Sequence, residues 1–221
     1  METYLITQEN QSGGRRTRDV VEAAIAGGID VVQVREKPES TRRRLEIARE
    51  VRKITAEAGI PMIVDDRVDI ARAAGADGVH LGDTDLPVPV ARDQLGEDAI
   101  IGRSVSTVEE AKEAAAAGAD YLGVGAIFST QSKDVEEEKR DLGLEVVRAI
   151  DEAVDVPFVG IGGVGPDNAA DVVQAGADGV AVISAITEAD DPEEATRALG
   201  EAVAEGKRRR NEAAETVGDA R

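Results

Sequence analysis

The segment Gly28-Ile29-Asp30-Val31-Val32 is one copy of a pattern that recurs along the chain. In this pattern a glycine ends a helix in the left-handed conformation, a short turn follows, and an apolar strand begins. The other copies are Gly75-Ala76-Asp77-Gly78-Val79, Gly118-Ala119-Asp120-Tyr121-Leu122 and Gly176-Ala177-Asp178-Gly179-Val180. The copies precede every second candidate strand, so the repetition predicts parallel strands that alternate regularly with helices.

Short apolar runs rich in β-branched residues mark eight candidate strands. Alanine-rich helical patterns lie between most of them. One helix is predicted to begin with the capping box Thr107-Val108-Glu109-Glu110, and Pro166 and Pro192 suit first-turn positions. The candidate strands are Tyr4–Thr7, Val31–Val34, Met62–Val64, Gly78–Leu81, Ile100–Gly102, Tyr121–Ile127, Phe158–Ile161 and Gly179–Ile183.

Eight strand–helix units predict an α/β protein with a single (β/α)8 TIM barrel over residues 1–206. The charged segment 207–221 has lost the apolar period and is predicted to be a helix end followed by a frayed tail. The alternative fold is a doubly wound sheet, but no Gly-x-Gly-x-x-Gly follows the first strand to support it.

The net charge of the chain limits which classes of molecule can be its binding partners. There are 45 acidic and 26 basic residues, which gives a net charge of −19. Such a surface repels nucleic acid and anionic lipid, so we expect neither as a partner. The acids are spread along all the helices, which favours the solvated coat of a halophilic protein, soluble in concentrated salt, over an acidic ligand-binding surface. Without cysteine, signal peptide or apolar span, we expect a soluble, cytoplasmic protein, and the sequence leaves open whether it forms a homo-oligomer.

Polar side chains gather just after several strands, at the barrel edge where ligands bind. Gln33, Arg35 and Lys37 follow one strand, and Thr130-Gln131-Ser132-Lys133 follows another. Lys37 and Lys133 are two of only six lysines. Their placement predicts an anionic substrate such as a diphosphate, although ordinary surface ion pairs are the alternative.

Carboxylates occupy the ends of the third and fourth strands. Asp66 and Asp85, from neighbouring strands, could hold one Mg²⁺ whose other ligands are waters and substrate phosphates. Asp65 and Asp83 are weaker candidates. Alternatively, Asp66 caps the helix that follows it, or these aspartates belong to the acidic coat.

Gly160-Ile161-Gly162-Gly163 closes the seventh strand and predicts a phosphate site made of backbone N–H groups, or else a plain tight turn. His80 is the only histidine. With no second histidine and no cysteine, a zinc site is not expected, and no Ser-His-Asp triad can be assembled. We expect His80 to be a hydrogen-bonded core residue.

With these motifs placed, the chain resembles the thiamine phosphate synthase family from Tyr4 to Ile186. The motifs that carry the resemblance are Gln33-x-Arg35-Glu36-Lys37, Val64-Asp65-Asp66-Arg67, Gly78-Val79-His80-Leu81-Gly82-x-x-Asp85, Ile101-Gly102-x-Ser104, Gly125-x-Ile127-Phe128-x-Thr130-x-Ser132-Lys133 and Ile161-Gly162-Gly163.

The resemblance implies a reaction that joins hydroxymethylpyrimidine diphosphate to thiazole phosphate and releases pyrophosphate through a pyrimidine carbocation. It implies two small-molecule substrates and Mg²⁺ on Asp66 and Asp85. The other implied roles are pyrimidine diphosphate binding by Gln33, Arg35 and Lys37, with Asp65 beside them; leaving-group stabilisation by Lys133; a hydrogen bond from Ser104 to the pyrimidine; and thiazole phosphate binding by Thr130, Ser132, Gly163, Ile183 and Ser184.

The chain departs from the family pattern at two aspartates: the family usually has asparagine where Asp65 stands and glutamine where Asp83 stands. Asp65 either belongs to the acidic coat or tightens the Mg²⁺ requirement, and we favour the second. Alternative functions are a thiazole tautomerase of the same barrel family, a non-catalytic sensor of thiamine precursors, and an unrelated barrel isomerase or lyase. The polar segment from Ser129 to Asp141 is a candidate lid.

Overall fold

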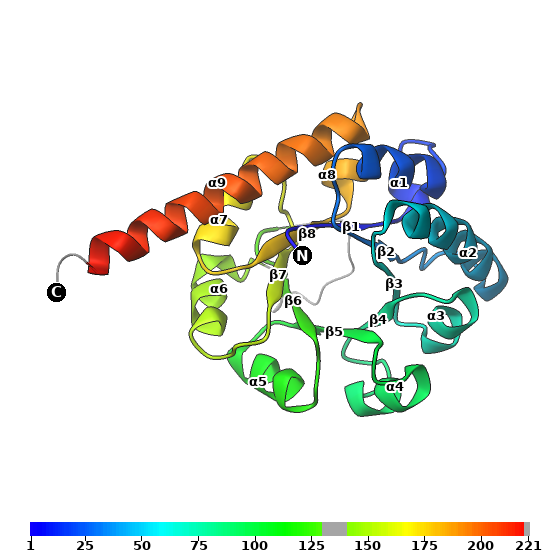
Figure 1. The fold of residues 1–221 in the computed structure, drawn as a ribbon, viewed down its shortest axis with the longest axis horizontal. Helices are drawn as coiled ribbons and strands as arrows, with labels where there is room; N and C mark the ends of the chain where they lie inside the picture. The colour runs from blue at the N-terminus through cyan, green and yellow to red at the C-terminus, as the bar shows by residue number, and fades with distance from the viewer. Residues whose placement is uncertain (130–140, 219–221) are drawn as a thin grey trace.

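The computed structural model describes residues 1–129 and 141–218. Eight parallel strands form a closed barrel in the order β1 to β8, each hydrogen-bonded to the next, and β8 pairs with β1 (Figure 1). The predicted TIM barrel is confirmed. The strands are β1 (Thr3–Ile6), β2 (Val31–Val34), β3 (Met62–Asp65), β4 (Gly78–Leu81), β5 (Ile100–Val105), β6 (Tyr121–Gly125), β7 (Phe158–Ile161) and β8 (Gly179–Val182).

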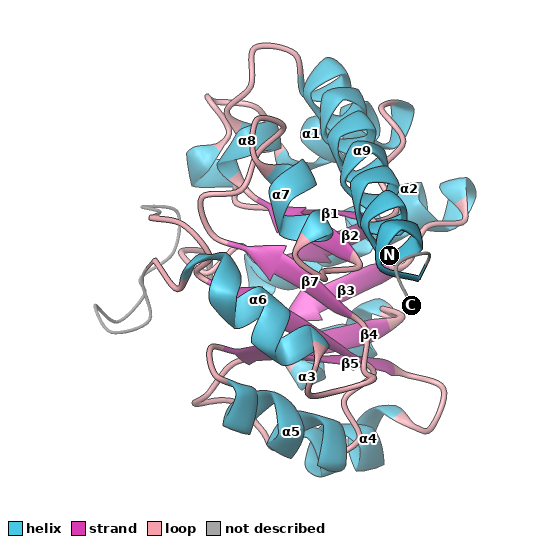
Figure 2. Cartoon of the chain, turned by 90° about the vertical axis from the view of Figure 1, so that its left-hand side faces the viewer, coloured by secondary structure: helices cyan, strands magenta, loops and turns pink. Residues whose placement is uncertain are grey.

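Helices surround the barrel on the outside (Figure 2). Thr107 and Glu110 form the predicted capping box at the start of α5. In the described residues the helices are η1 (Glu9–Gln11), α1 (Thr17–Ala26), α2 (Thr41–Ala58), α3 (Val68–Ala74), α4 (Val88–Leu95), α5 (Val108–Ala116), α6 (Gly143–Asp151), α7 (Ala169–Gln174), α8 (Ser184–Thr187) and α9 (Pro192–Gly218).

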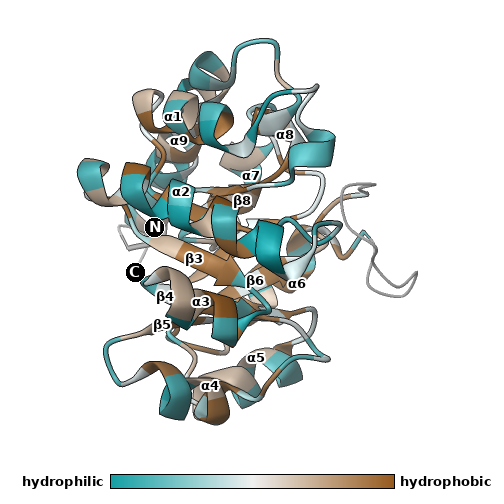
Figure 3. Cartoon of the chain, turned by 90° about the vertical axis from the view of Figure 1, so that its right-hand side faces the viewer, coloured by the Kyte–Doolittle hydropathy of each residue, from teal (hydrophilic) through white to brown (hydrophobic). Residues whose placement is uncertain are grey.

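The core has two layers because side chains alternate along each strand. The larger layer lies between strands and helices and includes Leu5, Val32 and Leu122. Figure 3 shows the resulting contrast between hydrophobic strands such as β3 and the hydrophilic surface of α2. The smaller layer fills the barrel and consists of Tyr4, Ile6, Val31, Ile63, Tyr121, Val159, Ala181 and Ile183.

The aspartate of each repeated segment has a shared structural task. Its side chain accepts a hydrogen bond from the backbone at the start of the preceding odd-numbered strand. Asp30 Oδ2 accepts from Thr3 N at 2.9 Å, and Asp120 Oδ2 accepts from Ile101 N at 2.7 Å. Asp77 and Asp178 do the same for Met62 N and Phe158 N. The repeat therefore ties the strands together in pairs at the N-terminal end of the barrel.

The glycines of the repeat adopt the predicted left-handed conformation, with φ of 93° at Gly28 and 86° at Gly118. Of the two prolines predicted to lie in the first turn of a helix, Pro192 does begin α9. The prediction for Pro166 needs correction, because Pro166 lies in a turn ahead of α7, which begins only at Ala169. The turn is closed by Asn168, whose backbone N–H donates to the Gly165 carbonyl.

The segment predicted to be a helix end and a frayed tail is helical as far as Gly218. Helix α9 continues through Lys207 to Gly218 and lies along α7 (Figure 1). Polar contacts hold it where the apolar period has ended. Lys207 Nζ lies 2.6 Å from Glu2 Oε1, and Arg210 donates to the Gly176 carbonyl at 2.6 Å.

Candidate active site

The predicted site residues that the structure describes all lie at or just beyond the C-terminal ends of the strands. Gln33 lies on β2, and Arg35 and Lys37 follow it. Asp65 ends β3, Asp66 follows it, and Ser104 lies on β5. Asp85 follows β4, Gly163 follows β7, and Ile183 and Ser184 follow β8. Thr130, Ser132, Lys133 and most of the candidate lid lie outside the described residues.

Cationic and acidic side chains from β2 and β3 meet at this edge. Lys37 Nζ lies 2.8 Å from Asp66 Oδ2 and 3.4 Å from Asp65 Oδ2. Gln33 donates to Asp65 Oδ1 at 2.5 Å, and Arg35 Nε lies 3.7 Å from Asp65 Oδ2. The charges of Asp65 and Asp66, together with the hydrogen bond to Asp66, outweigh the opposing effect of burial and raise the pKa of Lys37. Lys37 therefore keeps its positive charge at the edge of the barrel.

Glu36 is a residue of the first motif to which the sequence assigned no task. Its side chain is 1% exposed, and its backbone φ of 29° is unusual for a residue with a side chain. Oε1 accepts from Thr7 Oγ1 at 2.7 Å and Thr17 Oγ1 at 2.8 Å, and Oε2 accepts from Glu9 N at 2.9 Å. These bonds hold the turn that places Arg35 and Lys37 on either side. The sequence signal that could have revealed this role of Glu36 was the alternation of a cation, an acid and a cation at positions 35 to 37.

Asp66 and Asp85 are close enough for each carboxyl group to shift the pKa of the other. Burial raises the pKa of Asp85, and the neighbouring Asp66 raises it further. Burial alone would also raise the pKa of Asp66, but the hydrogen bonds from Lys37 and Asp85 and the charge of Lys37 lower it. Two carboxylates this close need a shared proton or a cation between them. Asp66 is held with φ of 60°, a strained conformation typical of functional positions.

This carboxylate pair fits Mg²⁺ by its donor chemistry. Both residues offer oxygen ligands, and Gly82 N donates to Asp85 Oδ2 at 2.6 Å, which orients that carboxylate. Within residues 1–129 and 141–218 there is no group of three or more His, Cys, Asp or Glu side chains that could hold a metal. A pair of carboxylates suits an ion that keeps waters and takes its other ligands from substrate phosphates.

The two unusual aspartates have different environments. Asp65 is 6% exposed and lies among Gln33, Arg35 and Lys37, so it is not part of a surface coat. Asp83 has an exposed side chain and forms a 3.0 Å ion pair with Arg103. Of the two positions that depart from the family pattern, only Asp65 therefore changes the charge inside the site.

A cavity of about 500 Å³ opens at the same edge, between the ends of β5 to β8. Three residues of the predicted phosphate site, Gly163, Ile183 and Ser184, are among its lining residues, and so is Ser104. Gly163 has φ of 63°, and a Cβ there would lie 2.6 Å from the Ser129 carbonyl oxygen, so only glycine fits. Asn168 closes the loop by accepting from Gly165 N at 2.9 Å. The glycine-rich segment that follows β7 thus forms a tight turn and also lines the cavity.

His80 points into the barrel and uses both ring nitrogens. Nδ1 lies 2.9 Å from Tyr121 Oη, and Nε2 lies 2.9 Å from Ser104 Oγ. The expectation of a hydrogen-bonded core histidine is confirmed. Its partners come from β5 and β6, which sequence reasoning did not identify.

The residue set and its order match a family model described as "Thiamine monophosphate synthase" over residues 3–186. The chain belongs to the thiamine monophosphate synthase family. The "Thiamine-phosphate synthase" of Natronomonas pharaonis is 62% identical over 200 residues, which cover 90% of this chain and 94% of that protein. The "Thiamine-phosphate synthase" of Haloarcula marismortui is 58% identical over 207 residues, which cover 93% and 98%.

A solved structure, "Thiamine phosphate pyrophosphorylase from Pyrococcus furiosus", superimposes with a TM-score of 0.85 at 42% identity and covers 93% of this chain and 96% of that one. The halophilic archaea among the family relatives agree with the acidic composition and confirm the predicted halophilic origin. No helix in the described part of the chain has the length and apolar character needed to span a membrane.

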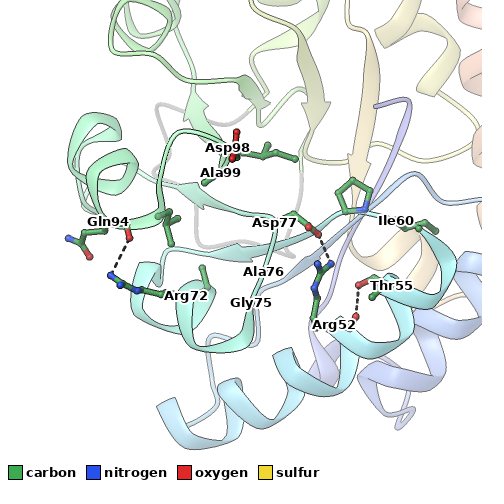
Figure 4. A pocket seen from close by; sticks show the side chains of 16 residues that line it. Arg52, Thr55, Ile60, Arg72, Gly75, Ala76, Asp77, Gln94, Asp98 and Ala99 are labelled. Atoms are coloured by element: carbon green, nitrogen blue, oxygen red, sulfur yellow. Dashed lines mark hydrogen bonds and ion pairs between the residues drawn. The ribbon is translucent and has the colours of Figure 1, made fainter.

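A second cavity, of about 760 Å³, lies at the opposite, N-terminal end of the barrel between the ends of α2, α3 and α4 (Figure 4). Its arginines are engaged with neighbouring groups: Arg52 pairs with Asp77 at 2.7 Å, and Arg72 donates to the Gln94 carbonyl at 3.3 Å. None of the strand-end motifs of the family reaches it. The C-terminal cavity is therefore the candidate active site.

Proposed function

We propose that the C-terminal edge of this barrel joins hydroxymethylpyrimidine diphosphate to thiazole phosphate, giving thiamine phosphate and pyrophosphate. One observation carries the proposal. The cation and carboxylate cluster of β2 to β4 and the glycine-walled cavity of β5 to β8 meet at His80. On the cluster side, the backbone carbonyl of His80 accepts from Asp66 N at 2.8 Å. On the cavity side, the His80 ring contacts Ser104, which lines the cavity. A diphosphate and a phosphate can thus be held on adjoining sides of one site.

Gln33, Arg35 and Lys37 bind the diphosphate side of the pyrimidine substrate in this proposal, and Ser104 hydrogen-bonds its ring. Gly163, Ile183 and Ser184, together with Thr130 and Ser132, bind the phosphate of the thiazole. A backbone N–H at Gly163 suits a phosphate oxygen because the glycine brings the main chain close to the cavity.

The reaction has two bond changes. The bond between the pyrimidine methylene carbon and the diphosphate oxygen breaks, and its electron pair leaves with pyrophosphate. The thiazole nitrogen then donates its lone pair to the resulting carbocation and forms the new C–N bond. Neither change needs a protein base or a protein nucleophile, so the Ser104 hydroxyl and the His80 ring that contacts it serve to hold the substrate in this proposal. Arg35, Lys37 and Lys133 stabilise the charge that develops on the leaving group.

Asp66 and Asp85 would hold Mg²⁺. When bound, the ion would neutralise negative charge on the departing diphosphate. Asp65 adds a buried carboxylate that competes with the diphosphate for Arg35 and Lys37. We therefore propose that Asp65 makes catalysis more dependent on Mg²⁺ than an asparagine would.

The test is pyrophosphate release from the two substrates in molar KCl, with and without Mg²⁺. Release that needs both substrates and the metal is expected. Asp66→Asn and Asp85→Asn should lower turnover about 100-fold or more, as loss of a charge-stabilising group does, while Asp93→Asn on the exposed face of α4 should not. Folded protein that binds thiazole phosphate without releasing pyrophosphate would instead indicate a tautomerase or a sensor.

The Asp65 proposal has its own measurement, the Mg²⁺ concentration at half-maximal rate. Asp65→Asn should lower this concentration because Arg35 and Lys37 are then freed to neutralise the diphosphate. An unchanged Mg²⁺ dependence would show that the buried carboxylate has no part in the metal requirement.

A further inference from the structure

A chain of hydrogen bonds crosses the interior of the barrel and ends at the candidate active site. Tyr4 Oη lies 2.8 Å from Tyr121 Oη, Tyr121 Oη lies 2.9 Å from His80 Nδ1, and His80 Nε2 lies 2.9 Å from Ser104 Oγ. Tyr4 and Tyr121 are each 1% exposed and His80 is 7% exposed. Only the Ser104 end of this chain lines the cavity.

The direction of these bonds decides which way Ser104 presents its hydrogen. Burial raises the pKa of both phenols, so both keep their hydrogens. In one direction, Tyr4 donates to Tyr121, Tyr121 donates to Nδ1 of His80, and the Nε2–H of His80 donates to Ser104 Oγ. In the reverse direction, His80 donates to Tyr121, Tyr121 donates to Tyr4, and the Tyr4 hydrogen must find another acceptor.

The reverse direction leaves a buried donor unused. Tyr4 belongs to the apolar layer inside the barrel, and Tyr121 is its only side-chain hydrogen-bond partner in the described part of the chain. An unused buried N–H or O–H is rarer in proteins than an unused lone pair, because an oxygen has a second lone pair to spare. The first direction uses every buried hydrogen and leaves unfilled only lone pairs of the two phenol oxygens.

We propose that His80 is a positioning residue that, as the Nε2–H tautomer held by Tyr121, donates to Ser104 Oγ and directs the Ser104 hydroxyl hydrogen into the cavity. Ser104 then recognises a hydrogen-bond acceptor, such as an unprotonated ring nitrogen, and disfavours a donor at the same place. This inference rests on the proposed function only for the identity of the ring that Ser104 contacts.

Two glycines make room for this chain of rings. A Cβ at Gly102 on β5 would lie 2.1 Å from Tyr121 Cζ, and a Cβ at Gly123 on β6 would lie 3.1 Å from His80 Cε1. Glycine weakens a strand interior and often marks a close approach by another group. Here the approaching groups are the two rings that lead to Ser104.

The tautomer can be measured directly because His80 is the only histidine in the chain. Protein labelled with ¹⁵N-histidine should give one imidazole, neutral at pH 8, with the hydrogen on Nε2. A hydrogen on Nδ1, or on both nitrogens, would overturn the proposal. The measurement needs no substrate, so its outcome is independent of the proposed function.

The two tyrosines provide a matched pair of variants. Tyr121→Phe removes the donor to Nδ1 and should weaken the preference for the Nε2–H tautomer. Tyr4→Phe leaves Tyr121 able to donate to His80 and should retain it. The opposite pattern, or a preference undiminished in Tyr121→Phe, would reject the direction argued above.

Kinetics test whether His80 acts through Ser104. His80→Asn removes the group that reaches Ser104, whereas the amide nitrogen of His80→Gln can replace Nε2. We expect kcat/KM to fall about 10-fold in His80→Asn, equivalent to about 1.4 kcal/mol, and distinctly less in His80→Gln. In a Ser104→Ala background, His80→Asn should cause no further loss. Additive losses, or equal losses in both His80 variants at unchanged melting temperature, would refute the coupling. If the wild-type protein releases no pyrophosphate, the proposed function fails while the tautomer result stands.

Discussion

Asp120→Ala should destabilise the barrel although Asp120 lies at the end opposite to the site. Its carboxylate accepts from Ile101 N at 2.7 Å and from Arg92 Nη2 at 2.7 Å. Ile101 is fully buried at the start of β5, so its N–H cannot turn to bulk water when the acceptor is removed. The repeat in the sequence places an equivalent aspartate before β2, β4 and β8.

The expected cost has two parts. A buried N–H left without a partner costs about 1–3 kcal/mol. The ion pair with Arg92 is partly exposed, with side-chain exposures of 17% and 45%, and contributes at most about 1 kcal/mol. Together these predict a loss of about 1–4 kcal/mol. For a domain of this size, the melting temperature falls by roughly 2–4 °C for each kcal/mol lost.

The assay is thermal unfolding followed by circular dichroism in molar KCl, with hydrogen exchange of the Ile101 amide as a local measurement. Asp120→Asn keeps an oxygen acceptor and should lose less than half as much stability. Asp93→Ala, at an exposed position on α4, serves as the control and should change stability by less than about 0.5 kcal/mol. If Asp120→Ala melts with the control, or if Asp120→Asn is as damaging as Asp120→Ala, the backbone bond is not the source of the stability.

The remaining predictions concern the site, the barrel interior and the surface. Glu36→Ala removes the acceptor of three buried or half-buried donors and should destabilise the fold by at least about 3 kcal/mol, measured by the same melts; a loss below about 1 kcal/mol would contradict this. Gly102→Ala should force Tyr121 from its place and lower the melting temperature, whereas an unchanged His80 imidazole spectrum would show that the ring had not moved. Lys133→Ala should lower kcat far more than it weakens thiazole phosphate binding, and equal losses in turnover assays and titrations would remove Lys133 from the leaving-group role. Reducing KCl from molar to tens of millimolar should lower the melting temperature because self-repulsion at a net charge of −19 is then less screened, and a salt-independent melt would contradict the acidic-coat interpretation.

Local patterns in the sequence determine the architecture of this protein. The apolar runs predict all eight strands to within a few residues, and the glycine–aspartate repeat predicts the helix ends. Parallel strands present their C-terminal ends at one edge, so the motif positions alone place Gln33, Asp66, Ser104 and Gly163 together. Helix α9 continues from Lys207 to Gly218 because ion pairs and hydrogen bonds with neighbouring elements replace the apolar period there, which the sequence pattern does not show.

Only the tertiary structure decided what individual side chains do within this frame. The sequence could not distinguish buried Asp65 from exposed Asp83, since both follow strands and both replace amides. Nor could it connect Tyr4 with Tyr121, which are 117 residues apart. Periodicity is a local property of the chain. Contacts across the barrel depend instead on strand register and on closure of the sheet between β8 and β1, which no local pattern encodes.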